Sequence, residues 1–136
     1  MTRRAAVALL MSLIASAASA PAWTHHSFAA AYDMSDAITV KGRIVQVRLT
    51  NPHSWFFVDV TGEDGQVSRW SFEAGTPSGM IRNGYSPKVI KEGDEVTIKG
   101  FHAKDKSQNA GMLRELVTAD GKVYGLFGPR EGADAK

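Results

Sequence analysis

The alternation of apolar and polar residues over positions 38–49 constrains the fold of this chain more than any other feature. Apolar side chains recur there with a period of two, which is typical of a half-buried β-strand and incompatible with an amphipathic helix. The phase of the alternation slips at Ile44 and Val45, which predicts a β-bulge that bends one long strand. The segment therefore predicts one long, bent β-strand.

Further strand-like segments follow, separated by turn residues such as Gly65, Gly93 and Gly121. The helical signals are confined to one place, where Thr76 is a suitable N-cap, Pro77 a suitable first helical residue and Gly84 a suitable stop. We expect strands at residues 55–61, 67–73, 95–102, 112–118 and 123–124. This order predicts a mainly β fold, a five- to six-stranded OB-like barrel with one short helix between strands 3 and 4. Another small, partly open barrel or a sandwich is the alternative.

The first 22 residues have the pattern of a cleavable signal peptide. Arg3 and Arg4 precede an apolar run at 5–15, and small residues fill positions 16–22. The apolar run is shorter than the roughly 20 residues that a membrane-spanning helix needs. Cleavage after Ala20 would place a proline directly beyond the cut, so we expect cleavage after Ala22 and a periplasmic or secreted protein.

The remaining chain then divides into three parts. We expect an N-terminal extension with a histidine pair at 23–37, the barrel domain at 38–127 and a disordered tail at 128–136. Removal of the signal peptide takes two arginines away, which leaves 14 basic and 14 acidic residues. A neutral domain of this kind is not suited to nucleic acid, and no later segment is apolar enough for an integral membrane span. There are no cysteines, so the core must suffice without disulfides.

His25 and His26 are the first candidate metal ligands. If the chain begins at Trp23, His25 is the third residue, and its imidazole can join the α-amine and two backbone nitrogens in a square-planar set for Cu(II). His26 can add an axial ligand. The alternative is that both histidines simply belong to a flexible terminus.

His53 and His102 are the second pair of candidates. In an OB-like order, the loop after strand 1 and the end of strand 4 open at the same end of the barrel. Glu73, at the end of strand 3, should reach that end too, and two imidazoles with one carboxylate form a reasonable divalent-metal set. The alternative is that His53 caps its own loop and His102 is solvated.

Aromatic residues near the same end could hold a ligand. Trp55 and Trp70 are candidates, with Asn51 beside them in the loop, although tryptophans in hairpins more often pack against cross-strand neighbours. We find no phosphate-binding loop, nucleophile elbow or pair of carboxylates arranged for catalysis. We therefore expect a non-enzymatic protein.

Several of these peptides are distinctive in combination. They are His25-His26-Ser27-Phe28 with Tyr32-Asp33, Thr50-Asn51-Pro52-His53-Ser54-Trp55, Val58-Asp59-Val60, Glu73-x-Gly75-Thr76-Pro77 and Gly93-Asp94-Glu95-Val96. With these motifs the chain resembles a family of small exported bacterial proteins known only as a domain of unknown function. The resemblance implies a periplasmic or secreted domain, and it implies no activity. In that family the histidine pair tends to follow the cleavage site directly, whereas here residues 21–24 separate Ala20 from the pair.

Two hypotheses about function follow. The first is divalent metal binding, most plausibly of copper, through the N-terminal histidines or through His53, His102 and Glu73. The second is an OB-like binding module for a small ligand, a peptide or another envelope protein. An enzyme of unknown reaction is a residual possibility that a pocket with a perturbed titratable group would revive.

Overall fold

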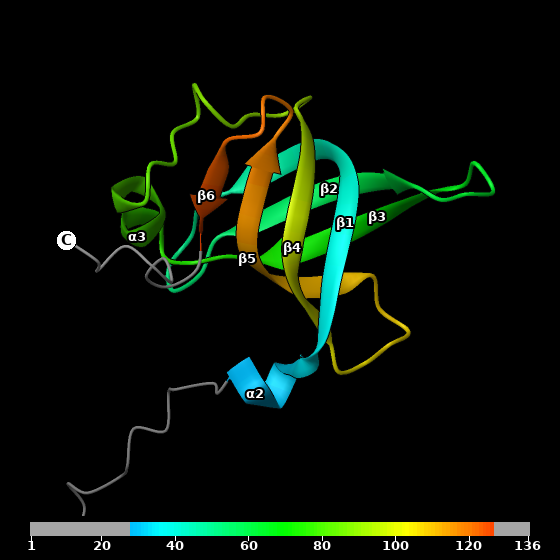
Figure 1. The fold of residues 1–136 in the computed structure, drawn as a ribbon. Coiled ribbons are helices and arrows are strands. Elements are labelled where there is room, and N and C mark those ends of the chain that lie inside the picture. Colours follow the sequence, from blue (N-terminus) through cyan, green and yellow to red (C-terminus); the bar gives the residue numbers. More distant parts are fainter. Residues whose placement is uncertain (1–27, 127–136) are drawn as a thin grey trace, which may run out of the picture.

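A computed structural model describes residues 28–126 of the protein (Figure 1). The fold is mainly β, with six strands and two short helices among the described residues. The elements follow one another as α2 (Phe28–Ala31), β1 (Tyr32–Arg48), β2 (Trp55–Thr61), β3 (Val67–Glu73), α3 (Pro77–Arg82), β4 (Glu95–Ala103), β5 (Ala110–Thr118) and β6 (Val123–Gly125). In this part of the chain, no helix is long and apolar enough to cross a membrane.

The strands form one sheet in the order β3-β2-β1-β4-β5-β6. Neighbours in this order are antiparallel, and β3 also pairs with β5 in parallel over the short stretch from Ser71 to Glu73. The extra pairing closes the first five strands into a cycle, so that β3 has partners on both sides where it ends. The long, curved β1 contacts both β2 and β4 (Figure 1).

The expected bulge in β1 is confirmed, because its register with β2 shifts between Ile44 and Gln46. The core lies on one face of the curved sheet, where alternate residues such as Phe56, Val58 and Ile98 are fully buried. Burial of apolar side chains on this scale is the main stabilising contribution in a domain without disulfides.

The predicted helix between strands 3 and 4 is present as α3. Thr76 is its N-cap and accepts a hydrogen bond from the backbone N–H of Gly79 at 3.1 Å, and Pro77 opens the first turn. Met80 is buried in the core, and the chain leaves the helix at Gly84 with a positive φ of 93°. The cap and the glycine stop explain why so short a segment is helical.

The beginning of β1 differs from the expectation. The strand starts at Tyr32, ahead of position 38, and α2 precedes it. Tyr32, Ala103 and Met112 form a small second core, against which Phe28, Phe101 and Ala110 pack. Residues 32–37 therefore belong to the sheet, and the expected N-terminal extension is in this part a strand.

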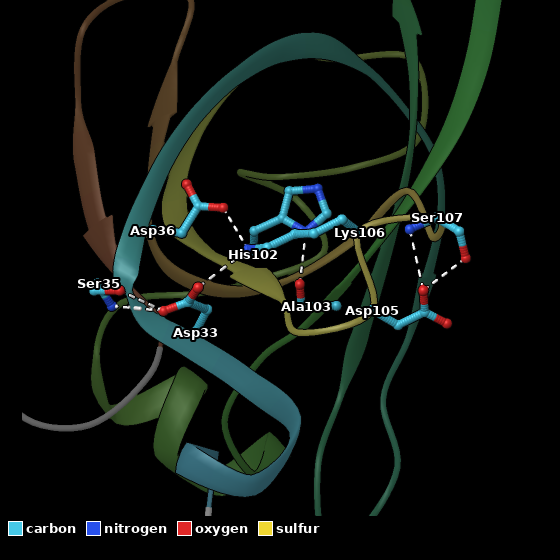
Figure 2. Close-up of polar contacts among 8 residues, drawn as sticks. All are labelled: Asp33, Ser35, Asp36, His102, Ala103, Asp105, Lys106 and Ser107. Atoms are coloured by element: carbon cyan, nitrogen blue, oxygen red, sulfur yellow. Dashed lines mark hydrogen bonds and ion pairs between the residues drawn. The ribbon is translucent and has the colours of Figure 1, made fainter.

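The loop between β4 and β5 holds the start of β1 in place. The backbone N–H of Lys104 donates to the carbonyl of Ala31 at 2.9 Å. The ammonium group of Lys106 lies 3.3 Å from a carboxylate oxygen of Asp33 and 2.5 Å from one of Asp36 (Figure 2). The predicted signal peptide and C-terminal tail fall outside the described residues.

Candidate functional site

A histidine, a glutamate and a tyrosine meet where β1 begins and β3 ends. The Nδ1 atom of His53 lies 2.5 Å from one carboxylate oxygen of Glu73. The hydroxyl of Tyr32 donates a hydrogen bond to the other oxygen. The Glu73 side chain is 15% exposed and that of His53 is 27% exposed. Both oxygens of a largely buried carboxylate are thus engaged, one by an imidazole and one by a phenol.

The backbone around His53 is fixed to the end of β3. The Thr50 hydroxyl donates to the carbonyl of His53 at 2.8 Å. The N–H of Ser54 donates to the carbonyl of Gly75, and the N–H of Ala74 donates to the carbonyl of Ser54, at 3.0 and 2.8 Å. The β1–β2 loop and the residues after Glu73 therefore continue the β2–β3 pairing, which holds the imidazole and the carboxylate in register.

Phe28 covers the imidazole from the side of α2. Its ring centroid lies 5.1 Å from that of His53 in a tilted arrangement and 6.3 Å from that of Tyr32 in a stacked one. The site thus combines groups from α2, from the first residue of β1, from the β1–β2 loop and from the last residue of β3. The second core beneath Phe28 and Tyr32 supports it.

The chemistry of the three groups is set by the carboxylate. Burial raises the pKa of the Tyr32 phenol, and the hydrogen bond to Glu73 raises it further, so Tyr32 stays a neutral donor at physiological pH. A carboxylate facing Nδ1 favours the imidazole form that carries its proton on that nitrogen, with the lone pair of the neutral ring on Nε2. Carboxylates orient metal-binding histidines in this way in many proteins.

His102 is not part of this cluster. It lies near the end of β4 in phase with Ile98 and Gly100, as expected, and its ring meets the ring of Trp70 edge-on, with centroids 5.4 Å apart. Its Nδ1 atom is 2.8 Å from the carbonyl oxygen of Ala103 (Figure 2). The described residues contain no group of three or more His, Asp or Glu side chains arranged to hold a metal ion. The expected set of His53, His102 and Glu73 is therefore not assembled.

Side-chain alternation in β3 explains the separation. Trp70 and Phe72 stack on each other at 5.8 Å on the core face, while Glu73, the next residue, points to the opposite face. His102 contacts Trp70 and so belongs to the core side, whereas His53 follows Glu73 to the other side. The predicted set therefore combined groups from the two faces of this end of the sheet.

The other predicted residues have separate positions. Trp55 pairs with Glu73 across β2 and β3 and is partly buried. Trp70 packs on Phe72 and His102, and Asn51 is exposed in the loop. The predicted ligands His25 and His26 lie outside the described residues, three and two positions before Phe28.

Sequence reasoning assigned no role to Phe28 or Tyr32. Both belong to distinctive peptides that precede the first predicted strand. The distinctive sequence of these peptides was the available signal for a role. Neither a hydrogen bond over 41 positions nor a ring contact with a loop histidine can be read from local periodicity.

Comparison with known proteins adds the family and no activity. No curated protein matches the chain. A family model, described as a family of unknown function (DUF6152), matches residues 12–113, which include Tyr32, His53, Glu73 and His102. The chain therefore belongs to this family of unknown function, DUF6152.

Proposed function

We propose that the protein is an exported, non-enzymatic domain that binds a divalent transition metal, copper first among them, with His53 as the central ligand. The observation that carries the proposal is the 2.5 Å contact between Nδ1 of His53 and the Glu73 carboxylate. A carboxylate in this position fixes the orientation in which Nε2 can coordinate a metal.

The further ligands would come from the histidine pair ahead of α2. Phe28 contacts the ring of His53, and His26 precedes Phe28 by two residues. This short separation along the chain supports His25 and His26 as the further ligands, and a site rich in imidazole suits Cu(II).

Export is the second part of the proposal. It is supported by the arginines at positions 3 and 4, the apolar run and the small residues up to Ala22. If the peptidase cuts before Trp23, the new amino terminus offers the competing square-planar site built on the α-amine and His25. The two arrangements share His25 and differ in their need for His53.

The test uses protein recovered from the periplasm of a host that expresses the full chain. Intact mass fixes the amino terminus, and calorimetric titration with Cu(II) gives the affinity. We expect His53→Ala and His25→Ala each to weaken Cu(II) binding at least about tenfold. Glu73→Gln, which removes the charge behind His53, should weaken it about 10- to 100-fold.

His102→Ala is the matched control. It removes an imidazole of the same domain that contacts Trp70 and not the Glu73 carboxylate, so we expect unchanged Cu(II) affinity. Loss of binding in His25→Ala with full binding in His53→Ala would assign the metal to the amino terminus and refute the role of His53. Absence of Cu(II) binding by the correctly processed protein would refute metal binding altogether.

An OB-like binding module is the second candidate. The closed cycle of strand pairings through β3 and β5 supports an OB-like barrel. The observation that favours ligand binding is a cavity of about 320 Å³ beside Trp55. Its volume is at the lower end of the range of small-molecule pockets, about 300–1,000 Å³.

A further inference from the structure

The cavity beside Trp55 lies next to the His53–Glu73–Tyr32 cluster and shares only Tyr32 with it. Its volume is about 320 Å³. Three alanines, Ala31, Ala103 and Ala110, line it and leave room that larger side chains would fill. Trp55 and Tyr32 supply aromatic surface, and Asp105 supplies a carboxylate from the β4–β5 loop. A small ligand with an apolar body and one polar end matches this lining.

Asp105 gives the cavity a negative charge. Its carboxylate accepts hydrogen bonds from the Ser107 hydroxyl at 2.6 Å, the Ser107 N–H at 3.1 Å and the Gln108 amide at 2.8 Å. These bonds, led by that of the Ser107 hydroxyl, lower the pKa of Asp105, so the group is anionic at neutral pH. The other titratable group that lines the cavity, Tyr32, stays neutral. The lining thus has a net charge of −1.

Lys106, which follows Asp105 in the loop, does not cancel this charge. The ammonium group of Lys106 is directed to Asp33 and Asp36 of β1, at 3.3 and 2.5 Å, whereas Asp105 turns to Ser107 (Figure 2). The cavity is therefore unfavourable for an anion, and a neutral ligand would leave the negative charge of the lining uncompensated. A cation can pair with the Asp105 carboxylate and can also interact with the aromatic rings that line the cavity.

We propose that this cavity binds a small organic ammonium ion, with the cationic head beside Asp105 and its methyl or methylene groups packed against the indole of Trp55. An organic cation is favoured over a metal ion because apolar groups make up much of the lining. The inference goes beyond metal binding and requires neither His53 nor Glu73. It is tested on metal-free protein, so its failure and the failure of the copper proposal are distinguishable.

Choline is a suitable probe, and 3,3-dimethyl-1-butanol is its neutral isostere. The metal-free mature protein is titrated with each compound while backbone amide shifts are recorded by NMR. We expect saturable shifts with choline, largest at Trp55, Ala103, Asp105 and Ala110. The isostere should bind at least about tenfold more weakly, because it lacks the charge that pairs with the carboxylate and the ring.

Two variants test the cavity itself. Asp105→Asn removes the charge and should weaken choline binding about tenfold. Asp120→Asn removes a carboxylate from the turn before β6, where it accepts from the Thr118 hydroxyl, and should leave the affinity unchanged. Ala110→Leu fills the cavity without altering the loop, and should abolish binding while the amide spectrum stays that of a folded domain.

Three results would overturn the inference. They are equal affinity for choline and the isostere, unchanged choline affinity in Asp105→Asn, and shift changes that map away from Trp55 and the β4–β5 loop. Absence of any shift at choline concentrations of about 10 mM, which corresponds to less than about 3 kcal/mol of binding free energy, would overturn it as well.

Discussion

Replacing Tyr32 with phenylalanine isolates one hydrogen bond of the site. Tyr32 is only 6% exposed, and its hydroxyl donates to Glu73. A hydrogen bond to a charged group contributes about 1.5–3 kcal/mol to stability. Glu73 keeps its contact with His53 and is 15% exposed, so water can take up part of the loss. We therefore expect Tyr32→Phe to lower the free energy of unfolding by about 1.5 kcal/mol, the lower end of that range.

Tyr124→Phe is the matched control. Tyr124 is 3% exposed, and its buried hydroxyl has no hydrogen-bond partner within residues 28–126. Lys122 lies over its ring, with Nζ 5.1 Å from the centroid, and phenylalanine preserves that contact. Removing an unsatisfied buried hydroxyl relieves a desolvation penalty, so we expect this variant to be as stable as the parent or up to about 1 kcal/mol more stable.

Urea unfolding of the two variants and the parent, followed by tryptophan fluorescence at about pH 7, measures the difference. The same substitution at two buried tyrosines should therefore change the free energy of unfolding by amounts that differ by at least about 1 kcal/mol. Equal changes in the two variants would show that the hydroxyl of Tyr32 contributes nothing through Glu73. Tyr32 would then have no role in stabilising the Glu73 carboxylate.

Two further predictions concern the fold. A Cβ added at Gly100 would lie 1.8 Å from the carbonyl oxygen of Met112, where only backbone can yield, so Gly100→Ala should lower the free energy of unfolding by about 3 kcal/mol or more. At Gly62 the nearest atom is the flexible end of the Asp64 side chain. Gly62→Ala should therefore lower the free energy of unfolding by less than about 1 kcal/mol in the same urea measurement. Hydrogen bonds from neighbouring groups lower the pKa values of Asp94 and Asp105 in the folded state. Their contribution to the free energy of unfolding is present above the unfolded pKa of about 3.9 and is lost as the pH falls through the folded pKa values. The urea midpoint should therefore decrease between about pH 6 and about pH 2.5. A constant midpoint would contradict this prediction.

Local patterns predicted most of the fold because they reflect local causes. The alternation in β1, its bulge at Ile44 and the Thr76 cap of α3 depend on residues that are close in sequence. The start of β1 depends on distant residues. Tyr32 and Met34 alternate with polar residues, but Asp36 breaks the pattern before the regular alternation begins. Tyr32 is in the sheet because it pairs with Ala103 and packs in the second core. Periodicity carries no information about such a pairing.

The site was predicted in part for a related reason. Strand order places loop ends at one end of a sheet, which predicts that His53 and Glu73 are neighbours, and their side chains are in contact. It does not say on which face a side chain at that end lies. Glu73 and His102 share an end, yet the alternation of β3 and the contact of His102 with Trp70 assign them to opposite faces. A metal set chosen by its end of the sheet alone therefore combined side chains that do not form one group in this structure.

The start of β1 is consequently part of the candidate site and not a linker to it. Tyr32 supplies one of the two donors to Glu73, and Phe28 packs on His53, so the residues that follow the histidine pair are built into the cluster around the imidazole. Dividing the chain at position 38 would remove both groups and the first part of a strand that pairs with β4. The two most distinctive peptides of the sequence, one with the histidine pair and one with His53, thus meet through Phe28 at one place in the fold. We therefore propose that His53 and the amino-terminal histidines hold one copper ion, so that loss of either should weaken the same binding event.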